Sequence, residues 1–209
     1  MPSAASSIKT RMRLIAAAQS LLGSGKGDAS IQEIAKIAGV GVGSFYTHFS
    51  EKRQLFEVAA TEAQDLDNGK LREIAYSFED PILGFIASVI YACGRPKYDP
   101  RLNRIILTAG PRLFATSHYL DEPRQLLRAG IAAGKVKPVD VEAWVASIAG
   151  SYQNLLALMD ANVADETMPR RMFWLFAQQL GYSEDSYLAA AEVAERLVQE
   201  RVAANSTAS

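Results

Sequence analysis

The chain has 209 residues, of which 49% are hydrophobic and 22% are charged, a composition typical of folded proteins and unlike that of disordered ones. Its longest apolar run, residues 82–94, is too short to cross a bilayer, and its N-terminus lacks the apolar stretch of a secretory signal, so we expect a cytoplasmic protein without membrane contact. Because the one cysteine and the two histidines have no metal-ligand spacing, we expect no intrachain disulfide, no metal and no cofactor.

Charge is distributed unevenly along the chain, although the net charge is only −1. Residues 1–60 hold seven Lys and Arg against four Asp and Glu, a net charge of +3, and the remainder holds 15 against 19, a net charge of −4. A basic N-terminal segment followed by an acidic remainder is compatible with an N-terminal segment that binds phosphate. Chance clustering of solvated charges explains so small an imbalance equally well.

The first predicted element is a helix whose apolar residues recur every three or four positions. The predicted stripe consists of Ile8, Met12, Ile15, Ala16, Gln19 and Leu22. A cluster of glycines follows at Gly23, Gly25 and Gly27, and we expect it to end the helix.

The second predicted helix, residues 31–38, begins with a capping box. The Ser30 hydroxyl is placed to accept from the Glu33 amide, and the Glu33 carboxylate is placed to reach back to the Ser30 amide. Ile34, Ile37 and Ala38 are expected to face inward. Gly39 is placed to take the left-handed conformation that follows many helices.

A short third helix is predicted over residues 42–49, directly after this turn. Phe45 and Phe49 are four residues apart and are expected to be buried on one side. Ser50 is expected to cap a longer fourth helix that runs from residue 51 into the seventies. The inner face of that helix is predicted to contain Leu55, Phe56, Ala59 and Ala63.

Prolines divide the rest of the chain at helix-length intervals. The helices predicted between them cover residues 82–93, 101–108, 122–133, 141–161, 170–180 and 184–203. Because strand-like alternation is scarce throughout, the predicted fold class is all-α.

A capped helix, a glycine turn and a second short helix together predict a helix-turn-helix, whose second helix enters the major groove of DNA. The residues that carry this pattern are the Ser30 capping box, Gly39, the run Gly43-Ser44-Phe45-Tyr46-Thr47-His48-Phe49, and Lys52 with Gln54-Leu55-Phe56. In order and spacing they closely resemble the DNA-binding domain of tetracycline-repressor-type (TetR family) transcriptional regulators. The resemblance covers about the first quarter of the chain.

This resemblance implies a DNA interface at defined positions. It implies phosphate contacts from Tyr46, His48 and Lys52. Base or nearby contacts are implied at Gly41, Val42, Gly43, Ser44 and Thr47, and Ser30 is placed in the same interface. Since Gly41, Val42 and Gly43 offer no side-chain hydrogen bond, direct readout is expected to depend on Val42 against a thymine methyl group and on Ser44 and Thr47, with DNA shape supplying the rest.

The C-terminal part of the chain carries no motif, so its function is inferred from its residue types. The helix predicted over residues 141–161 and its neighbours bring aromatic and apolar side chains together with a few polar ones, as in a largely apolar ligand pocket. The predicted lining is Phe85, Val89, Arg112, His118, Trp144, Ile148, Tyr152 and Met159. Taken singly, each aromatic or aliphatic member is more often a core residue than a ligand-lining one.

Together these features predict an N-terminal helix-turn-helix domain, residues 1–50, linked by a fourth helix to a helical ligand-binding and dimerisation domain within residues 51–209. By resemblance, the function is that of a homodimeric regulator, a repressor that leaves a palindromic operator when a small, largely apolar molecule binds. The alternatives are an all-helical adaptor that binds protein through an apolar groove and an enzyme without a recognisable motif. Gly39, Gly41 and Gly43 do not form a dinucleotide loop, because Ser44 stands where the third glycine is required and a helix precedes them.

Overall fold

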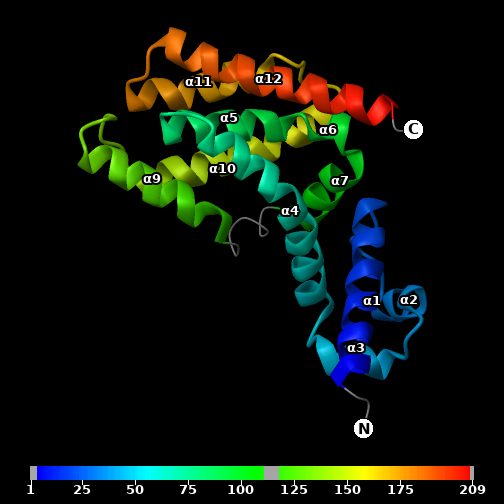
Figure 1. The fold of residues 1–209 in the computed structure, drawn as a ribbon. Coiled ribbons are helices and arrows are strands. Elements are labelled where there is room, and N and C mark those ends of the chain that lie inside the picture. Colours follow the sequence, from blue (N-terminus) through cyan, green and yellow to red (C-terminus); the bar gives the residue numbers. More distant parts are fainter. Residues whose placement is uncertain (1–3, 111–117, 208–209) are drawn as a thin grey trace. The chain divides into compact units, whose positions relative to one another are not determined.

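The structure is a computed structural model that describes residues 4–110 and 118–207. These residues form α-helices, one short 3-10 helix and connecting loops, with no strand, so the predicted all-α fold class is confirmed (Figure 1). The chain divides into two compact units. The N-terminal unit comprises Met1–Leu66 with Arg101–Leu113, and the C-terminal unit comprises Asp67–Pro100 with Phe114–Ser209. The predicted functional boundary after residue 50 stays a prediction.

The N-terminal unit contains α1 (Ala4–Gly23), α2 (Ile31–Ala38), α3 (Val42–His48), the first half of α4 (Lys52–Tyr76) and nearly all of α7 (Pro100–Ala109). Its core consists mainly of aliphatic and aromatic side chains from all of these helices, including Leu14, Leu22, Ile34, Phe45, Leu55, Ala59 and Ile105. The predicted inner face of α4 is confirmed, since Leu55, Phe56, Ala59 and Ala63 are all buried. α7 joins this unit from a later part of the chain: Thr108 Oγ1 donates to the Leu22 carbonyl at 3.3 Å.

The predicted apolar stripe of α1 was partly wrong. Ile8 and Met12 are 62% and 64% exposed, and Ala16 is exposed as well. The buried residues of α1 are Leu14, Ile15, Ala17, Ala18, Leu21 and Leu22. Because burial begins at Leu14, the first turns of α1 extend beyond the core. The spacing of apolar residues in these turns therefore does not indicate which of them are buried.

Two smaller predictions about the N-terminal helices were also wrong. Ile37 is 49% exposed, so α2 buries Ile34, Ala35 and Ala38 instead. The Ser50 hydroxyl does not accept from an α4 amide: Ser50 N and Oγ both donate to Gln54 Oε1, at 2.8 and 3.1 Å. The Gln54 side chain therefore holds Ser50, and α4 begins at Lys52.

The C-terminal unit is built around α5 (Pro81–Cys93), of which ten of 13 residues are buried. α5 contacts the four longer helices of the unit, α9 (Asp121–Ala132), α10 (Val141–Asp160), α11 (Met168–Leu180) and α12 (Glu184–Thr207). Asp80 caps α5, because its Oδ1 accepts from the amides of Ile82 and Leu83 at 2.9 and 3.2 Å. The predicted helices in this part agree with these elements to within a few residues. The four-residue helix α6 (Arg95–Tyr98) and the 3-10 helix His118–Leu120 were not predicted.

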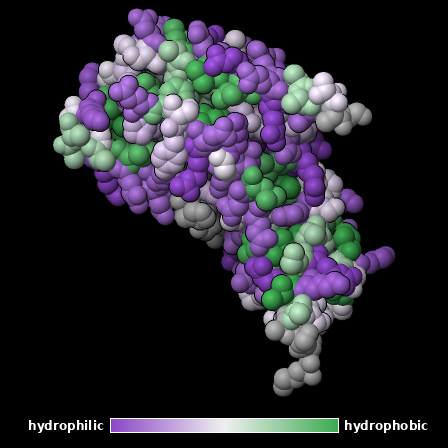
Figure 2. Space-filling model, viewed as in Figure 1, coloured by the Kyte–Doolittle hydropathy of each residue, from purple (hydrophilic) through white to green (hydrophobic). Residues whose placement is uncertain are grey.

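The surface of the described residues is mixed in polarity. Hydrophilic side chains cover most of the face seen in Figure 2, with smaller hydrophobic areas between them. Among the described helices, none combines the length and the apolar character that crossing a bilayer requires.

Candidate nucleic-acid interface

The turn between α2 and α3 is specified by local hydrogen bonds. Ser30 Oγ accepts from the Glu33 amide at 3.1 Å, which confirms this half of the predicted capping box at the start of α2. At its end, Gly39 adopts φ 62° and ψ 42°, the predicted left-handed conformation. The Gly39 N–H donates to the Lys36 carbonyl at 3.1 Å and the Val40 N–H to the Ala35 carbonyl at 3.0 Å. These two bonds form a Schellman motif, which sets the direction in which the chain leaves α2.

A second helix fixes the same turn from outside. Arg13 Nη2 on α1 donates to the Gly39 carbonyl at 3.1 Å. This contact was not predicted, because Arg13 and Gly39 are 26 residues apart and nothing in the sequence pairs them. Arg13 therefore ties α1 to the turn that orients α3.

α3 is held from behind by aromatic side chains. Phe45 is completely buried and Phe49 is 3% exposed, as predicted, and their ring centroids lie 6.0 Å apart. Tyr46 packs edge-on against Phe45 with a centroid distance of 5.3 Å, yet its side chain remains 58% exposed. The Phe45 side of α3 is thus anchored in the core, and the phenol of Tyr46 stays accessible to a partner.

The N-terminal end of α3 is open. A Cβ atom built on Gly41 or Gly43 would have no heavy atom within 4 Å, so the space outside this end of the helix is free. Val42 is 37% exposed, and Thr47 is exposed with its Oγ1 donating to the Gly43 carbonyl at 3.2 Å. A flat surface could therefore approach the α3 backbone closely here.

The remaining predicted DNA contacts differ in their surroundings. Ser30 is exposed, whereas Ser44, His48 and Lys52 are half-buried. Lys52 Nζ donates to the Gly27 carbonyl at 3.4 Å and lies 5.6 Å from the centroid of the Phe56 ring. Its ammonium group thus already has an acceptor within the N-terminal unit, which the sequence did not indicate.

The predicted ligand-lining side chains that the structure describes lie in the C-terminal unit, and several of them are core. Trp144, Ile148 and Tyr152 are buried, whereas Phe85, Val89 and Met159 are half-buried. Of this set the structure brings Phe85 and Trp144 together, with ring centroids 6.5 Å apart. Arg112 lies outside the described residues, and so does the side chain of His118.

Trp144 is fully engaged in packing. Its Nε1 donates to the Phe176 carbonyl at 3.4 Å, and its ring meets the Phe176 ring edge-on at 5.7 Å between centroids. Since Trp144 is only 4% exposed, any ligand that touches it must first displace part of the core.

A buried charged cluster, which the sequence did not predict, lies beside Tyr152. The Arg95 guanidinium is 1% exposed and donates from Nε and Nη2 to Asp67 Oδ2, at 3.0 and 2.8 Å, while its Nη1 donates to the Tyr152 hydroxyl. Burial lowers the pKa of Arg95, but the acidic groups of Tyr152, Tyr98 and Asp67 outweigh it and raise the pKa overall. Burial raises the pKa of the Tyr152 phenol, so this hydroxyl stays protonated beside Arg95 at neutral pH.

A known protein family matches the N-terminal part of the chain. Residues 14–59 match the model of the family described as bacterial regulatory proteins, tetR family. No curated protein matches the chain.

Solved structures match the fold of nearly the whole chain. The resorcinol complex of RolR has a TM-score of 0.68 at 21% identity, covering 93% of this chain and 97% of RolR. FadR from Bacillus subtilis, in complex with stearoyl-CoA, has a TM-score of 0.60 at 19% identity, covering 80% and 98%. TylP, a tetR regulator from Streptomyces fradiae, has a TM-score of 0.57 at 20% identity, covering 91% of each chain. At such identities the likeness shows the fold alone.

The segment that matches the family model is the segment that forms the helix-turn-helix. Residues 14–59 run from the buried part of α1 through the Schellman turn and α3 into the first turns of α4. They therefore contain the whole helix-turn-helix and the exposed face of α3. This segment of the chain is therefore similar to the DNA-binding domain of the tetR family of bacterial regulatory proteins.

Proposed function

We propose that the chain is a homodimeric transcriptional repressor that binds a palindromic DNA operator through α3 and releases it when a small molecule binds. The observation that carries this proposal is the exposed face of α3 within the segment that matches the tetR family model. Val42 and Tyr46 stand on the outside of α3, and Phe45 holds the helix in the core. A recognition helix needs this arrangement, because it lies in the major groove with its N-terminal residues toward the bases.

In this proposal, the bases are read by few side chains. Val42 contacts a thymine methyl group, and the hydroxyls of Ser44 and Thr47 reach base edges. Gly41 and Gly43 leave space for the α3 backbone to approach the groove. Because these contacts are few, the shape and deformability of the operator carry part of the specificity.

Phosphates are held by the longer polar side chains around α3. Tyr46 donates its hydroxyl, His48 donates from its imidazole, and Ser30 contributes from the start of α2. Lys52 supplies a charge: an ammonium group has three donors, so it can keep one at the Gly27 carbonyl while others meet a phosphate.

The effector site is proposed within the C-terminal unit. Solved neighbours of this fold carry chemically different ligands, resorcinol in RolR and stearoyl-CoA in FadR. Here the half-buried Phe85, Val89 and Met159 are the predicted lining residues that a largely apolar ligand reaches with least loss of existing packing. Such a ligand must bind the released state more tightly than the DNA-bound state, because equal affinity for both would leave the equilibrium between the two states unchanged.

Dimerisation is proposed through α11 and α12, which pack side by side (Figure 1). Leu175 on α11 is 59% exposed, as expected for an apolar side chain that a second copy covers. Two such helices from each protomer would form a four-helix bundle, with the same patch on both sides of a two-fold axis.

A selection experiment tests this function. The full chain is incubated with random double-stranded DNA, and the bound fragments are recovered and sequenced. We expect a palindromic sequence to be enriched, and its affinity to fall linearly on a double-logarithmic plot against salt concentration. Addition of small apolar molecules to the complex then identifies an effector by release. Failure to enrich any sequence would contradict the proposal.

A further inference from the structure

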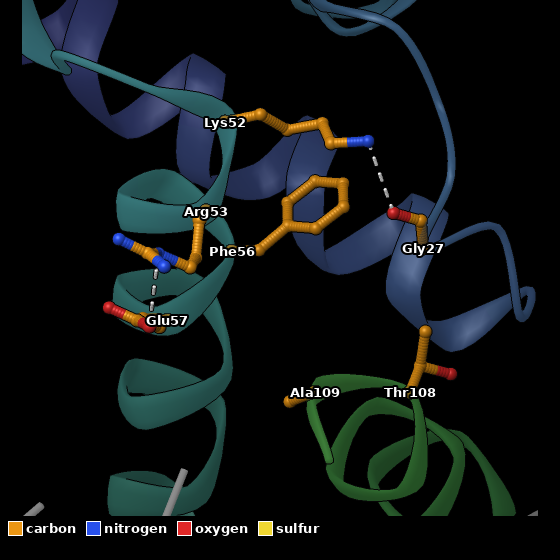
Figure 3. A pocket seen from close by; sticks show the side chains of 7 residues that line it. All are labelled: Gly27, Lys52, Arg53, Phe56, Glu57, Thr108 and Ala109. Carbon is orange, nitrogen blue, oxygen red and sulfur yellow. Dashed lines mark hydrogen bonds and ion pairs between the residues drawn. The ribbon is translucent and has the colours of Figure 1, made fainter. Parts of the chain in front are cut away.

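A cavity of 240 Å³ lies inside the N-terminal unit. It is bounded by the loop after α1 at Gly27, the first two turns of α4 and the last residues of α7 (Figure 3). The proposed function does not use it, since the effector is placed in the other unit. Its volume lies below the 300–1,000 Å³ range of pockets for drug-sized ligands, so only a small molecule fits.

The walls of this cavity are apolar. Phe56 projects from α4 into the space between that helix and the Gly27 loop, and Thr108 and Ala109 face it from α7 (Figure 3). Phe56 is 9% exposed, so its ring is a fixed surface rather than a mobile one. A compact hydrocarbon body would bury apolar surface against these three side chains.

The polar groups at the cavity are predominantly cationic. Lys52 and Arg53 line it together with one carboxylate, Glu57. Arg53 Nη2 is paired with Glu51 Oε1 at 2.8 Å, and Arg53 Nε lies 3.9 Å from Glu57 Oε1. Arg53 therefore stands next to the negative charge of Glu57, and the ammonium of Lys52 is left at the Gly27 end of the cavity.

The present acceptor of Lys52 is a weak one. The distance from Lys52 Nζ to the Gly27 carbonyl is 3.4 Å, beyond the usual range for a charge-assisted hydrogen bond of about 2.7–2.9 Å. An anionic oxygen that enters the cavity would offer this ammonium a shorter and stronger bond.

We propose that this cavity binds a small monocarboxylate with a compact apolar body, its carboxylate at Lys52 Nζ and its body against Phe56, Thr108 and Ala109. Lys52 is also the cation proposed to meet an operator phosphate. If the proposed function holds, the carboxylate and the operator phosphate compete for the single positive charge of this ammonium group. The anion then weakens DNA binding from within the N-terminal unit.

Binding is tested first without DNA, using the full chain and benzoate as the probe. The methyl resonance of Thr108 is assigned by labelling and followed by NMR as benzoate is added. We expect saturable shifts of this methyl group, and at least tenfold weaker binding of benzamide, which has the same shape without the charge. Equal binding of benzoate and benzamide, or an unmoved Thr108 methyl at saturation, would overturn the proposal, as would equal displacement of benzoate by inorganic phosphate.

A cavity-filling variant provides the control. Ala109→Leu places a larger side chain in the cavity and leaves every proposed DNA contact intact. We expect it to keep its thermal midpoint and its operator affinity and to lose the benzoate-dependent shift. Benzoate binding equal to that of the original chain would contradict the proposed location. Should this variant be unfolded, the comparison of benzoate with benzamide in the original chain still decides the question.

The consequence for DNA is measured separately. Saturating benzoate is expected to raise the operator Kd of the original chain about tenfold, the effect of one lost phosphate contact, and to leave that of Ala109→Leu unchanged. Equal effects on both chains would contradict the competition. If the chain binds benzoate at Thr108 but enriches no DNA sequence, the site stands and the proposed function fails. If it binds DNA while Thr108 never responds, the function stands and this site fails.

Discussion

At the scale of single residues, Tyr46 is the side chain whose role in the proposed interface can be tested most cleanly. Its ring packs on Phe45, and its phenol stands outside the unit. Removing the hydroxyl therefore leaves the packing in place and removes one donor to phosphate.

We expect Tyr46→Phe to weaken operator binding roughly tenfold, the effect of losing one hydrogen bond to a charged group, without changing the preferred sequence. Fluorescence anisotropy at fixed salt measures the affinity. Tyr76→Phe is the matched control, because Tyr76 is equally exposed, at 59%, and belongs to the C-terminal unit. If both variants bind the operator as the original chain does, Tyr46 does not contact phosphate.

Cys93, unlike the exposed Tyr46, is a chemically reactive residue that the fold shields from solvent. Its side chain is completely buried in α5, and burial raises the pKa of the thiol well above its ordinary value. The reactive thiolate is therefore scarce at neutral or mildly alkaline pH. We expect iodoacetamide at pH 8 to label Cys93 only after the chain is unfolded in denaturant, as read by intact mass. Rapid labelling of the folded chain would show that α5 opens readily.

At the scale of elements, the turn before α3 depends on a residue that tolerates positive φ. Gly39 has φ 62°, and a Cβ atom there would lie 2.4 Å from Arg13 Nη2. An alanine at this position would be strained in the left-handed region and would push away the arginine that holds the turn.

We expect Gly39→Ala to lower the free energy of unfolding by about 1–2 kcal/mol. Gly69→Ala is the matched control: Gly69 lies within α4, a Cβ atom there would have no heavy atom within 4 Å, and the change is expected to stabilise by about 0.5–1 kcal/mol. Urea denaturation of both variants gives the comparison. Two changes of the same sign would contradict the role assigned to Gly39.

The sequence predicted the elements whose signals are local. The Ser30 cap, the left-handed Gly39 and the buried Phe45 and Phe49 all depend on neighbours within a few residues, and all were found. The predicted burial of Ile8 and Met12 was wrong, because helical spacing shows that an apolar stripe exists but does not show where the core that covers it ends. The contact of Arg13 with Gly39 and that of Lys52 with Gly27 join distant segments, for which a single sequence carries no signal.

At the scale of the whole molecule, the buried pair of Arg95 and Asp67 joins α6 to the second half of α4 within the C-terminal unit. Removing one partner would leave the other charge buried and unpaired, which costs much more than losing an exposed ion pair. Sequence patterns did not indicate this pair, because its members are 28 residues apart.

We expect Arg95→Met to lower the free energy of unfolding by about 3–5 kcal/mol. Arg171→Met is the control, since Arg171 pairs with Asp165 on the surface with side chains 58% and 64% exposed, and it is expected to cost less than about 1 kcal/mol. Both values come from urea unfolding curves. Similar small effects would mean that water reaches Asp67 once Arg95 is removed.

The central claim is that the N-terminal end of α3 lies against DNA, and a charge placed at Gly43 tests it most directly. A side chain fits there, because a Cβ atom would have no heavy atom within 4 Å, and a carboxylate in the first turn of a helix does not destabilise it. The measurement is the affinity of Gly43→Glu and of the uncharged, equally large Gly43→Gln for the selected operator. The expected result is that the glutamate variant keeps its thermal midpoint and binds at least tenfold more weakly than the glutamine variant. Equal affinities of the two variants would contradict the account.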